Sequence, residues 1–219
     1  AVDATEFEEK LCALVPDGTM VWVWTDQKGD VKVRAQTGVG KNAVSEGDTY
    51  NQYTDRLALA FIKINKAQVL PADKRDNSTN VNTPAQNWIR LTNGWERDDA
   101  GHAIGGQFGG PGKLASGNVF PQDRFTNQQI AAPWEQEVGQ LAKDNPTQAD
   151  FHMCLLELFD YLDPPGRWDQ RPLEEVNFLL QEGTPKNAPA TMPATVFLLN
   201  NPNLNVGNPT NTALRTPNP

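Results

Sequence analysis

The residues best suited to chemistry lie in one stretch, between positions 97 and 137. It begins with Arg97–His102 (RDDAGH), continues through Phe108–Gly112 (FGGPG) and Asn118–Gln122 (NVFPQ), and includes Asn127 and Glu135. An imidazole beside a Gly-rich turn, followed by an amide and a carboxylate eight residues apart, suits one hard metal ion and one general base. These groups could hydrolyse a phosphodiester, provided that the segments meet in space.

His102 is the candidate general base. Imidazole titrates near pH 6.5, so it can accept a proton from water at neutral pH. A structural histidine hydrogen-bonded in a turn is the alternative, but Asp98 and Asp99 before it and the glycine pairs after it favour the catalytic role. The chain contains only two histidines, which excludes a metal site built from clustered histidines.

Asn127 and Glu135 are the candidate metal groups. Asn127 offers a neutral oxygen, and Mg²⁺ prefers oxygen ligands, keeps several waters and often takes only one or two protein groups. Asn127 could also be the N-cap of a helix predicted over 129–143, and the two roles are compatible. Glu135 lies about two turns further along this helix on the same face. It could hold a metal-bound water or be an ordinary surface carboxylate.

The charge distribution leaves a nucleic-acid partner open. The net charge of −8 argues against one, but residues 31–90 contain nine Lys and Arg against five Asp and Glu. This basic block directly precedes the motif region and could face phosphates or be a solvated surface. Arg97, Lys113 and Arg124 are near enough in sequence to contact phosphate, although each could also be a plain surface charge.

Hydrophobic periodicity and turn residues predict the elements that must position these groups. A capping box at Thr5–Glu8 opens an N-terminal helix, and a β-hairpin follows at Met20–Trp24 and Val31–Ala35. Tyr53–Leu70 fits either a strand or a helix. The remaining predictions are loops at 36–50 and 71–86, a short strand at Trp88–Leu91, helices at 129–143, 151–162 and 172–183, and a short strand at Thr195–Leu199.

The two cysteines, Cys12 and Cys154, fall in segments that both indicate amphipathic helix. We interpret them as two buried thiols, although a disulfide between them is compatible with the sequence. No apolar run is long enough to cross a bilayer, and no basic-then-apolar leader opens the chain. An export signal would therefore have been removed, lie on a larger parent chain, or never have existed.

Other catalytic and nucleotide-binding sites fit the sequence poorly. Cys154 lies on an apolar face and no nucleophile-elbow sequence occurs, which excludes a Ser- or Cys-centred triad. The run Gly105–Gly112 has neither a Walker pattern nor a strand–GxGxxG–helix arrangement, so a nucleotide-binding loop is rejected. We interpret His152 as structural.

The motif stretch resembles the DNA/RNA non-specific endonuclease family, also called ββα-metal or His-Me finger nucleases, and above all its bacterial toxin branch. The strong resemblance covers about 40 residues, and Gln129 and Ala100 depart from the pattern, which has Gly at the first position and, in one branch, Arg at the second. The start of the following helix is therefore expected to be distorted. The matching positions are Arg97–His102, Ile104, Phe108–Gly112, Leu114, Asn118–Gln122, Asn127 and Glu135, with a one-residue insertion around Ala115–Gly117.

The resemblance implies a role for each candidate residue. His102 would be the general base, Asn127 would bind one Mg²⁺ (or Mn²⁺) ion directly, and Glu135 would belong to the metal site through a water. Since Ala100 replaces an arginine, transition-state charge would be met by another cation, such as Arg97 or Arg124, or by the metal alone. The implied reaction is hydrolysis of DNA, with RNA as a second substrate, with weak sequence preference and 5′-phosphate ends.

Lys113 and Arg124 are the candidate substrate-binding cations. The resemblance further implies an α+β fold with an antiparallel sheet, flanking helices and a ββα-metal core at about 88–145. We expect an N-terminal helix at 1–18, a nuclease domain at 19–185 and an Asn/Pro-rich extended tail at 186–219.

The toxin branch implies a biological setting that the residues alone do not. The protein would be a secreted or delivered bacterial effector that acts in the cytoplasm of a target cell, and its producer would need a cognate immunity protein. The alternative is a binding module that kept the nuclease fold without turnover, which the acidic composition and the irregular stretch 128–134 favour.

Overall fold

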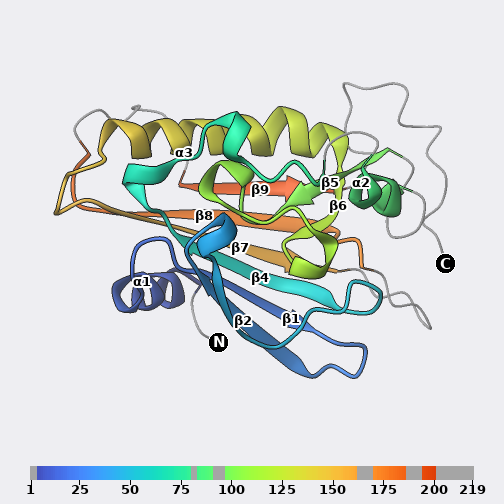
Figure 1. Ribbon diagram of the computed structural model, residues 1–219. Helices are drawn as coiled ribbons and strands as arrows, with labels where there is room; N and C mark the ends of the chain where they lie inside the picture. Colours follow the sequence, from blue (N-terminus) through green and yellow to red (C-terminus); the bar gives the residue numbers. More distant parts are fainter. Residues whose placement is uncertain (1–3, 80–82, 91–96, 162–169, 186–193, 201–219) are drawn as a thin grey trace.

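The computed structural model describes residues 4–79, 83–90, 97–161, 170–185 and 194–200. Within these ranges the chain has a mixed α and β fold built on antiparallel strands (Figure 1). The helices are α1 (Ala4–Leu14), α2 (Pro84–Trp88) and α3 (Ala132–Asp144). The strands are β1 (Met20–Thr25), β2 (Val31–Thr37), β3 (Val44–Gly47), β4 (Arg56–Lys63), β5 (Asp98–His102), β6 (Val119–Asp123), β7 (His152–Asp160), β8 (Glu174–Glu182) and β9 (Thr195–Leu199).

Seven of these strands form one sheet in the order β3-β2-β1-β4-β7-β8-β9, with every neighbouring pair antiparallel. The predicted hairpin is confirmed as β1 and β2, joined by a turn in which Gly29 has a φ of +84°. The ambiguous segment 53–70 contains strand β4, and β9 confirms the short strand predicted at 195–199. β5 and β6 form a separate two-stranded antiparallel sheet.

The large sheet has a hydrophobic core on each face, because side chains alternate along a strand. Trp22 and Trp24 of β1 point into the larger core, which Trp134 of α3 also enters. Val21, which directly precedes Trp22 in sequence, points to the opposite face, where Phe61 is fully buried beneath residues of α1. The larger core also receives residues from the segments around β5 and β6, so α3 and this pair cover one face and α1 covers the other.

β7 and β8 are strands, and the helices predicted at 151–162 and 172–183 are wrong. β7 lies inside the sheet with apolar contacts on both faces, so apolar residues occupy consecutive positions such as Met153 and Cys154. Periodicity cannot distinguish such a run from a buried helix. Gly183 follows β8 with a φ of +83°, in a turn where any Cβ would collide with the Asp150 carbonyl oxygen.

Two further elements differ from prediction. The strand predicted at 88–91 is wrong, because Trp88 ends helix α2. Thr83 caps this helix by accepting from the Gln86 amide (3.4 Å), and Pro84 lies in its first turn. Leu91 lies outside the described residues. The predicted loop at 36–50 contains strand β3, which pairs with β2, and the predicted loop at 71–86 contains a 3₁₀ turn at Ala72–Lys74.

Cys12 and Cys154 form a disulfide that joins α1 to β7. The interpretation of two buried thiols is therefore wrong, and Cys154 lies in a strand and not in a helix. Both residues are buried, and 142 residues separate them in sequence. The predicted N-terminal helix is confirmed as α1, although the side chain of Thr5, the proposed cap, lies outside what the structure describes.

β5, β6 and α3 follow one another as a ββα unit that carries the candidate site. The predicted helix at 129–143 is confirmed as α3, and its start is distorted, as expected: Thr126–Ala131 form a π-helical segment (η7) before Ala132. A π-helical turn holds more residues than an α-helical turn, so residues on either side of it do not share one straight helix face.

Within the described ranges, no helix combines the length and apolar character needed to span a membrane. Of the tail predicted at 186–219, the structure describes residues 194–200. These form the edge strand β9 and end at Asn200, whose side chain is buried and accepts from the Asp123 amide (3.1 Å). The rest of the predicted tail lies outside the described residues.

Candidate functional site

The Gln86 side chain of α2 closes the second edge of β5, whose other edge pairs with β6. The Gln86 Nε2 donates to the Asp98 carbonyl oxygen (3.0 Å), and its Oε1 accepts from the Ala100 amide (3.0 Å). Arg90 also donates to the Asp98 carbonyl oxygen, through Nε at 3.2 Å. One side chain thus takes the place of a neighbouring strand and fixes the backbone that carries Asp99 and His102.

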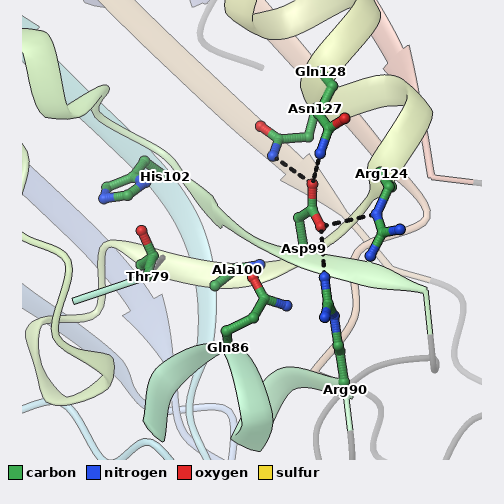
Figure 2. A pocket seen from close by; sticks show the side chains of 9 residues that line it. All are labelled: Thr79, Gln86, Arg90, Asp99, Ala100, His102, Arg124, Asn127 and Gln128. Carbon is green, nitrogen blue, oxygen red and sulfur yellow. Dashed lines mark hydrogen bonds and ion pairs between the residues drawn. The ribbon is translucent and has the colours of Figure 1, made fainter. Parts of the chain in front are cut away.

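The Asp99 carboxylate lies at the centre of the candidate site (Figure 2). Its Oδ1 accepts from Arg90 Nη2 at 3.3 Å and from Arg124 Nε at 3.2 Å. Its Oδ2 accepts from Asn127 Nδ2 at 3.2 Å and from Gln128 Nε2 at 2.8 Å. Two cations and two amides therefore converge on one carboxylate, whose side chain is only 10% exposed.

Asp99 orients the amide groups of Asn127 and Gln128. Both residues turn their amide nitrogens toward the same carboxylate oxygen, so the Oδ1 of Asn127 and the Oε1 of Gln128 point away from it (Figure 2). An amide oxygen is an acceptor with two lone pairs. Each residue therefore presents one neutral oxygen acceptor with an orientation set by its hydrogen bond to Asp99, and the two oxygens point in different directions (Figure 2).

Asp98 points to the opposite side of β5 and holds the strand against the body of the fold. Its carboxylate accepts from Arg171 Nε (2.7 Å) and Nη2 (3.0 Å), and both side chains are almost fully buried. Arg171 also donates to the backbone of Asn200. Because consecutive strand residues face opposite sides, this buried pair supports the strand while Asp99 serves the site.

His102 and Asn127 line the same cleft, which has a volume of about 800 Å³. We call it the central cleft. It is open to solvent and strongly polar, and Figure 2 shows how its side chains lie around it. The residues that line it are Thr79, Gln86, Arg90, Asp99, Ala100, His102, Arg124, Asn127 and Gln128.

The His102 imidazole is held in an electrostatic setting that favours its neutral form. Burial lowers the pKa of His102 below its ordinary value, and the nearby Asp76 carboxylate partly offsets this effect. Its Nε2 is buried and has no hydrogen-bond partner among the described residues. Buried polar atoms normally have such a partner. A neutral imidazole with an unengaged nitrogen can take up a proton.

Asp76 is itself fixed beside His102. Its Oδ2 accepts from the Gly112 amide (2.8 Å), and its Oδ1 accepts from the Ser78 amide (2.9 Å) and hydroxyl (2.5 Å). Burial alone would raise the pKa of Asp76, but these bonds, together with the charge of His102, lower it overall. Asp76 is therefore a carboxylate that remains ionised and stabilises positive charge on His102.

The Gly-rich part of the motif and Asn118 shape the chain after His102. The Asn118 Oδ1 accepts from Trp22 Nε1 (2.9 Å) and the Ile104 amide (2.8 Å), while its Nδ2 donates to the Ile104 and Pro111 carbonyl oxygens, each at 3.0 Å. At Gly110 any Cβ would collide with the Ile104 carbonyl oxygen. These motif residues are thus structural: they fold the loop tightly and fix the end of β5.

Glu135 lies in an adjoining cleft of about 300 Å³, which His102 and Thr79 share with the central cleft. Its carboxylate lies against Gly105, where a Cβ would come within 2.5 Å of Glu135 Oε2. Gln107 Nε2 donates to the Glu135 carbonyl oxygen (2.7 Å) and so fastens the loop to α3. Burial raises the pKa of Glu135 to about 8, although the charge of Arg75 opposes this shift.

The other predicted site residues differ in whether they line the central cleft. Arg124 lines the central cleft beside Asp99, together with His102 and Asn127. Glu135 lines the adjoining cleft together with His102 but does not line the central cleft that contains Asn127. Asn127 lies within η7, and Glu135 lies in the α-helical segment that follows it. Lys113 lines neither of these clefts, and Arg97 lies in the turn that leads into β5 without lining them.

Five residues of the central cleft were not assigned a role from sequence: Thr79, Gln86, Arg90, Asp99 and Gln128. Asp99 was visible in the motif, and the alternation of strand side chains could have separated its role from that of Asp98. Gln86 and Arg90 lie in a segment that was predicted to be loop and strand, and no spacing rule connects them to the motif. Asp76, in a predicted loop, had no sequence signal either.

In the part of the chain that the structure describes, the side chains around the central cleft offer oxygen ligands and no cluster of acidic, histidine or cysteine ligands for a metal ion. Among the described residues, no three His, Cys, Asp or Glu side chains gather where they could hold a metal. The oriented oxygens of Asn127 and Gln128 suit a hard ion that keeps most of its water, as Mg²⁺ does. They do not suit a closed four-ligand site of cysteine and histidine.

No protein-family model matches the chain, and no curated protein matches it. Among solved structures, the fold is similar to one described as the Sda1 nuclease with bound zinc ion, with 16% sequence identity and a TM-score of 0.43. The similarity covers 82% of this chain and 83% of that chain. At this identity and TM-score, the similarity assigns a role to no residue of the site.

Proposed function

We propose that the protein is a metal-dependent endonuclease that hydrolyses phosphodiester bonds of DNA and, as a second substrate, RNA. The observation that carries this proposal is the shared central cleft: His102 and Asn127 both line it, with Arg90 and Arg124 close by. A general base, an oxygen-donor site for a cation and two guanidinium groups are the components that this hydrolysis requires.

In the proposed mechanism His102 accepts the proton of the water that attacks phosphorus. Its lowered pKa keeps the imidazole neutral near pH 7, which is the form able to accept a proton. Once protonated, the ring faces the ionised Asp76 carboxylate, which stabilises the positive charge. The loop fixed by Asn118 keeps the backbone of His102 in place during this transfer.

Asn127, with Gln128 beside it, would hold one Mg²⁺ or Mn²⁺ ion. When bound, the ion supplies positive charge that neutralises the phosphate oxygens. Asp99 acts on this site indirectly: it fixes the nitrogen side of both amides, so their oxygens need no reorientation. Asp99 is therefore a positioning residue in this proposal.

Arg124 and Arg90 would supply the positive charge that Ala100 does not. Each makes one bond to Asp99 Oδ1, and a guanidinium has five N–H donors, with which it can bind several acceptors at once. Asp99 keeps both cations at the cleft. In the same proposal Glu135 contributes from the adjoining cleft, on the other side of His102, and Arg97 contributes charge at the start of β5.

We further propose that the protein is a bacterial effector, secreted or delivered into a target cell, where it acts in the cytoplasm. An immunity protein would protect the producing cell from it. This role is supported by the resemblance of residues 97–135 to the toxin branch of the endonuclease family. Neither the clefts nor their charges bear on delivery.

A catalytically impaired binding module is the second candidate. Two observations favour it: Glu135 lies outside the cleft that contains Asn127, and the chain as a whole is acidic, with a net charge of −8. Such a module would bind nucleic acid or a protein without turning over a phosphodiester.

The test is incubation of the purified protein with plasmid DNA and with total RNA, in Mg²⁺, Mn²⁺ or Zn²⁺ and in EDTA. The proposal expects cleavage that depends on Mg²⁺ or Mn²⁺, is lost in EDTA and leaves 5′-phosphate ends. Cleavage that persists in EDTA would contradict the metal-dependent mechanism. The absence of cleavage with every ion, by a protein that still binds nucleic acid, would favour the binding module.

A further inference from the structure

A third cleft, of about 400 Å³, lies on the other side of Asp76 from His102. We call it the lysine cleft. Lys74, Arg75 and Lys113 line it, and three cations around one open cleft form a site for anionic groups. The proposed hydrolysis does not use this cleft. Its remaining lining comes from Gln36, Val39, Gly40, Ala43, Leu70, Asp76, Gly109, Gly110 and Pro111.

The three clefts adjoin one another at the residues they share. Arg75 and Asp76 line both the lysine cleft and the adjoining cleft. His102 and Thr79 line both the adjoining cleft and the central cleft. A surface track therefore runs from Arg124 at one end, past His102, to Lys113 at the other.

The cations of the lysine cleft are available for a ligand. Lys113 is exposed, and its ammonium group has no hydrogen-bond or ion-pair partner in the part of the chain that the structure describes. The Nζ of Lys74 lies 3.5 Å from Asp73, but both side chains are about 70% exposed, and such surface pairs contribute little. Arg75 donates from Nε to the Leu70 carbonyl oxygen (3.2 Å), which leaves its two amino groups.

The single carboxylate in this cleft does not cancel the positive charge. Asp76 already accepts three hydrogen bonds, from Gly112 and Ser78, and it also faces the imidazole of His102. Between the cations, the wall is bare backbone at Gly109 and Gly110. Gly109 has a φ of +90°, and at either position a Cβ would collide with a neighbour, so these two positions must present backbone to the cleft.

We propose that the lysine cleft binds the phosphodiester backbone of the substrate strand, several linkages away from the bond that is cleaved. That the bound strand is a nucleic acid rests on the proposed function. The track that joins the clefts is the path along which this strand would extend from the central cleft to the lysine cleft. Lysine ammonium groups on flexible stems contact phosphates as point charges and read no base, so binding is independent of sequence.

The test is a salt titration of nucleic-acid binding in EDTA, where cleavage does not interfere. The variant Lys74→Ala/Lys113→Ala is compared with wild type and with Lys28→Ala/Lys143→Ala, which removes the same charge at exposed positions outside all three clefts. Single-stranded DNA and RNA of one sequence are the two probes. All four lysines are exposed, so both variants should fold, and thermal unfolding verifies this.

We expect the cleft variant to bind each probe more weakly. The slope of log K against log salt should become shallower by about 1.4, from two lost contacts at about 0.7 each on a single strand. The control variant should keep the slope of wild type. A slope shared by all three proteins, equal losses in both variants, or no binding by wild type to either probe would overturn the proposal.

Cleavage assays judge the proposed function separately. A protein that binds with the expected slopes but never cleaves would leave the lysine cleft as a binding site and refute the nuclease. A protein that cleaves while the cleft variant keeps the slope of wild type would leave the nuclease and refute the lysine cleft.

Discussion

At the scale of single residues, Asp98 and Asp99 are neighbours with opposite roles. Asp98 is paired with Arg171 inside the fold, and Asp99 gathers two arginines and two amides at the cleft. Strand geometry separates them, because consecutive side chains leave opposite faces of the strand. The pair therefore offers two isosteric substitutions, one that affects the site and one that affects the fold.

Asp99→Asn should impair the metal site. An asparagine cannot accept from all four donors, so the amides of Asn127 and Gln128 lose their fixed orientation. We expect a loss of about 10–100-fold in cleavage rate, with a rise in the Mg²⁺ concentration needed for half the maximal rate. Steady-state cleavage at a series of Mg²⁺ concentrations measures both.

Asp98→Asn is the matched control. It removes one partner of a buried ion pair whose side chains are 1% and 5% exposed, so the free energy of unfolding should fall by about 3–5 kcal/mol, measured in urea. At temperatures where the variant is folded, its Mg²⁺ requirement should match that of wild type. If the two variants shifted the Mg²⁺ requirement equally, Asp99 would have no special role in positioning.

The sequence predicts those site residues that lie close together along the chain, and it does not predict those that tertiary packing brings in from other segments. His102, Asn127 and Arg124 lie within 26 positions of one another and on one ββα unit, and the structure brings all three to the central cleft. Gln86 and Asp76 reach the site from elements that precede the motif. Such contacts depend on tertiary packing, which periodicity and spacing do not report.

At the scale of elements, β7 and β8 explain where prediction fails. Both strands lie within the sheet, and apolar contacts on both faces erase the alternation that identifies a half-buried strand. The hairpin of β1 and β2 was predictable, because β2 has an exposed face and a glycine turn lies between the strands. The distorted start of α3 was predictable from Gln129, which departs from the pattern of the endonuclease family that the motif resembles.

The disulfide between α1 and β7 gives a prediction about the stability of the protein. Cys12 and Cys154 close a loop of 142 residues, and a crosslink over such a distance restricts the unfolded chain strongly. Cys12→Ser/Cys154→Ser should therefore lower the free energy of unfolding by about 2–4 kcal/mol, measured by urea titration. Wild type in a reducing agent should lose as much, and the double variant should not respond. Equal unfolding midpoints for wild type and variant would contradict a stabilising disulfide.

At the scale of the whole molecule, buried carboxyl groups set the response to pH. Glu8 on α1, Glu135 on α3, and Glu157 and Glu175 on adjacent strands all have a pKa that burial raises. The charge of Glu175 further raises the pKa of Glu157, while Gln122 donates to both oxygens of Glu175 at 2.8 and 3.0 Å and lowers the pKa of Glu175. Burial therefore favours the protonated form of these four glutamates.

Stability should fall as pH rises from about 5 to 8. A carboxyl with a raised pKa keeps its proton in the folded state after the unfolded chain has lost it near pH 4.5, so the stabilisation present below that pH is lost as pH rises toward the folded value, about 8 for Glu8. Glu8→Gln should flatten this dependence by a few kcal/mol, on the order of the shift of its pKa. Urea titrations at four pH values between 5 and 8 measure it. Stability that rises with pH would contradict the burial of these groups.

The role of His102 as general base is tested by the rate of plasmid cleavage in Mg²⁺, measured side by side for wild type and His102→Ala. We predict a loss of at least about 100-fold, the usual contribution of a general base. Folding should survive, because the buried Nε2 of His102 has no hydrogen bond to lose within the described residues, and binding to DNA in EDTA should be unchanged. A folded variant that cleaves in Mg²⁺ as fast as wild type would contradict the assignment of His102 and, with it, the proposed chemistry of the central cleft.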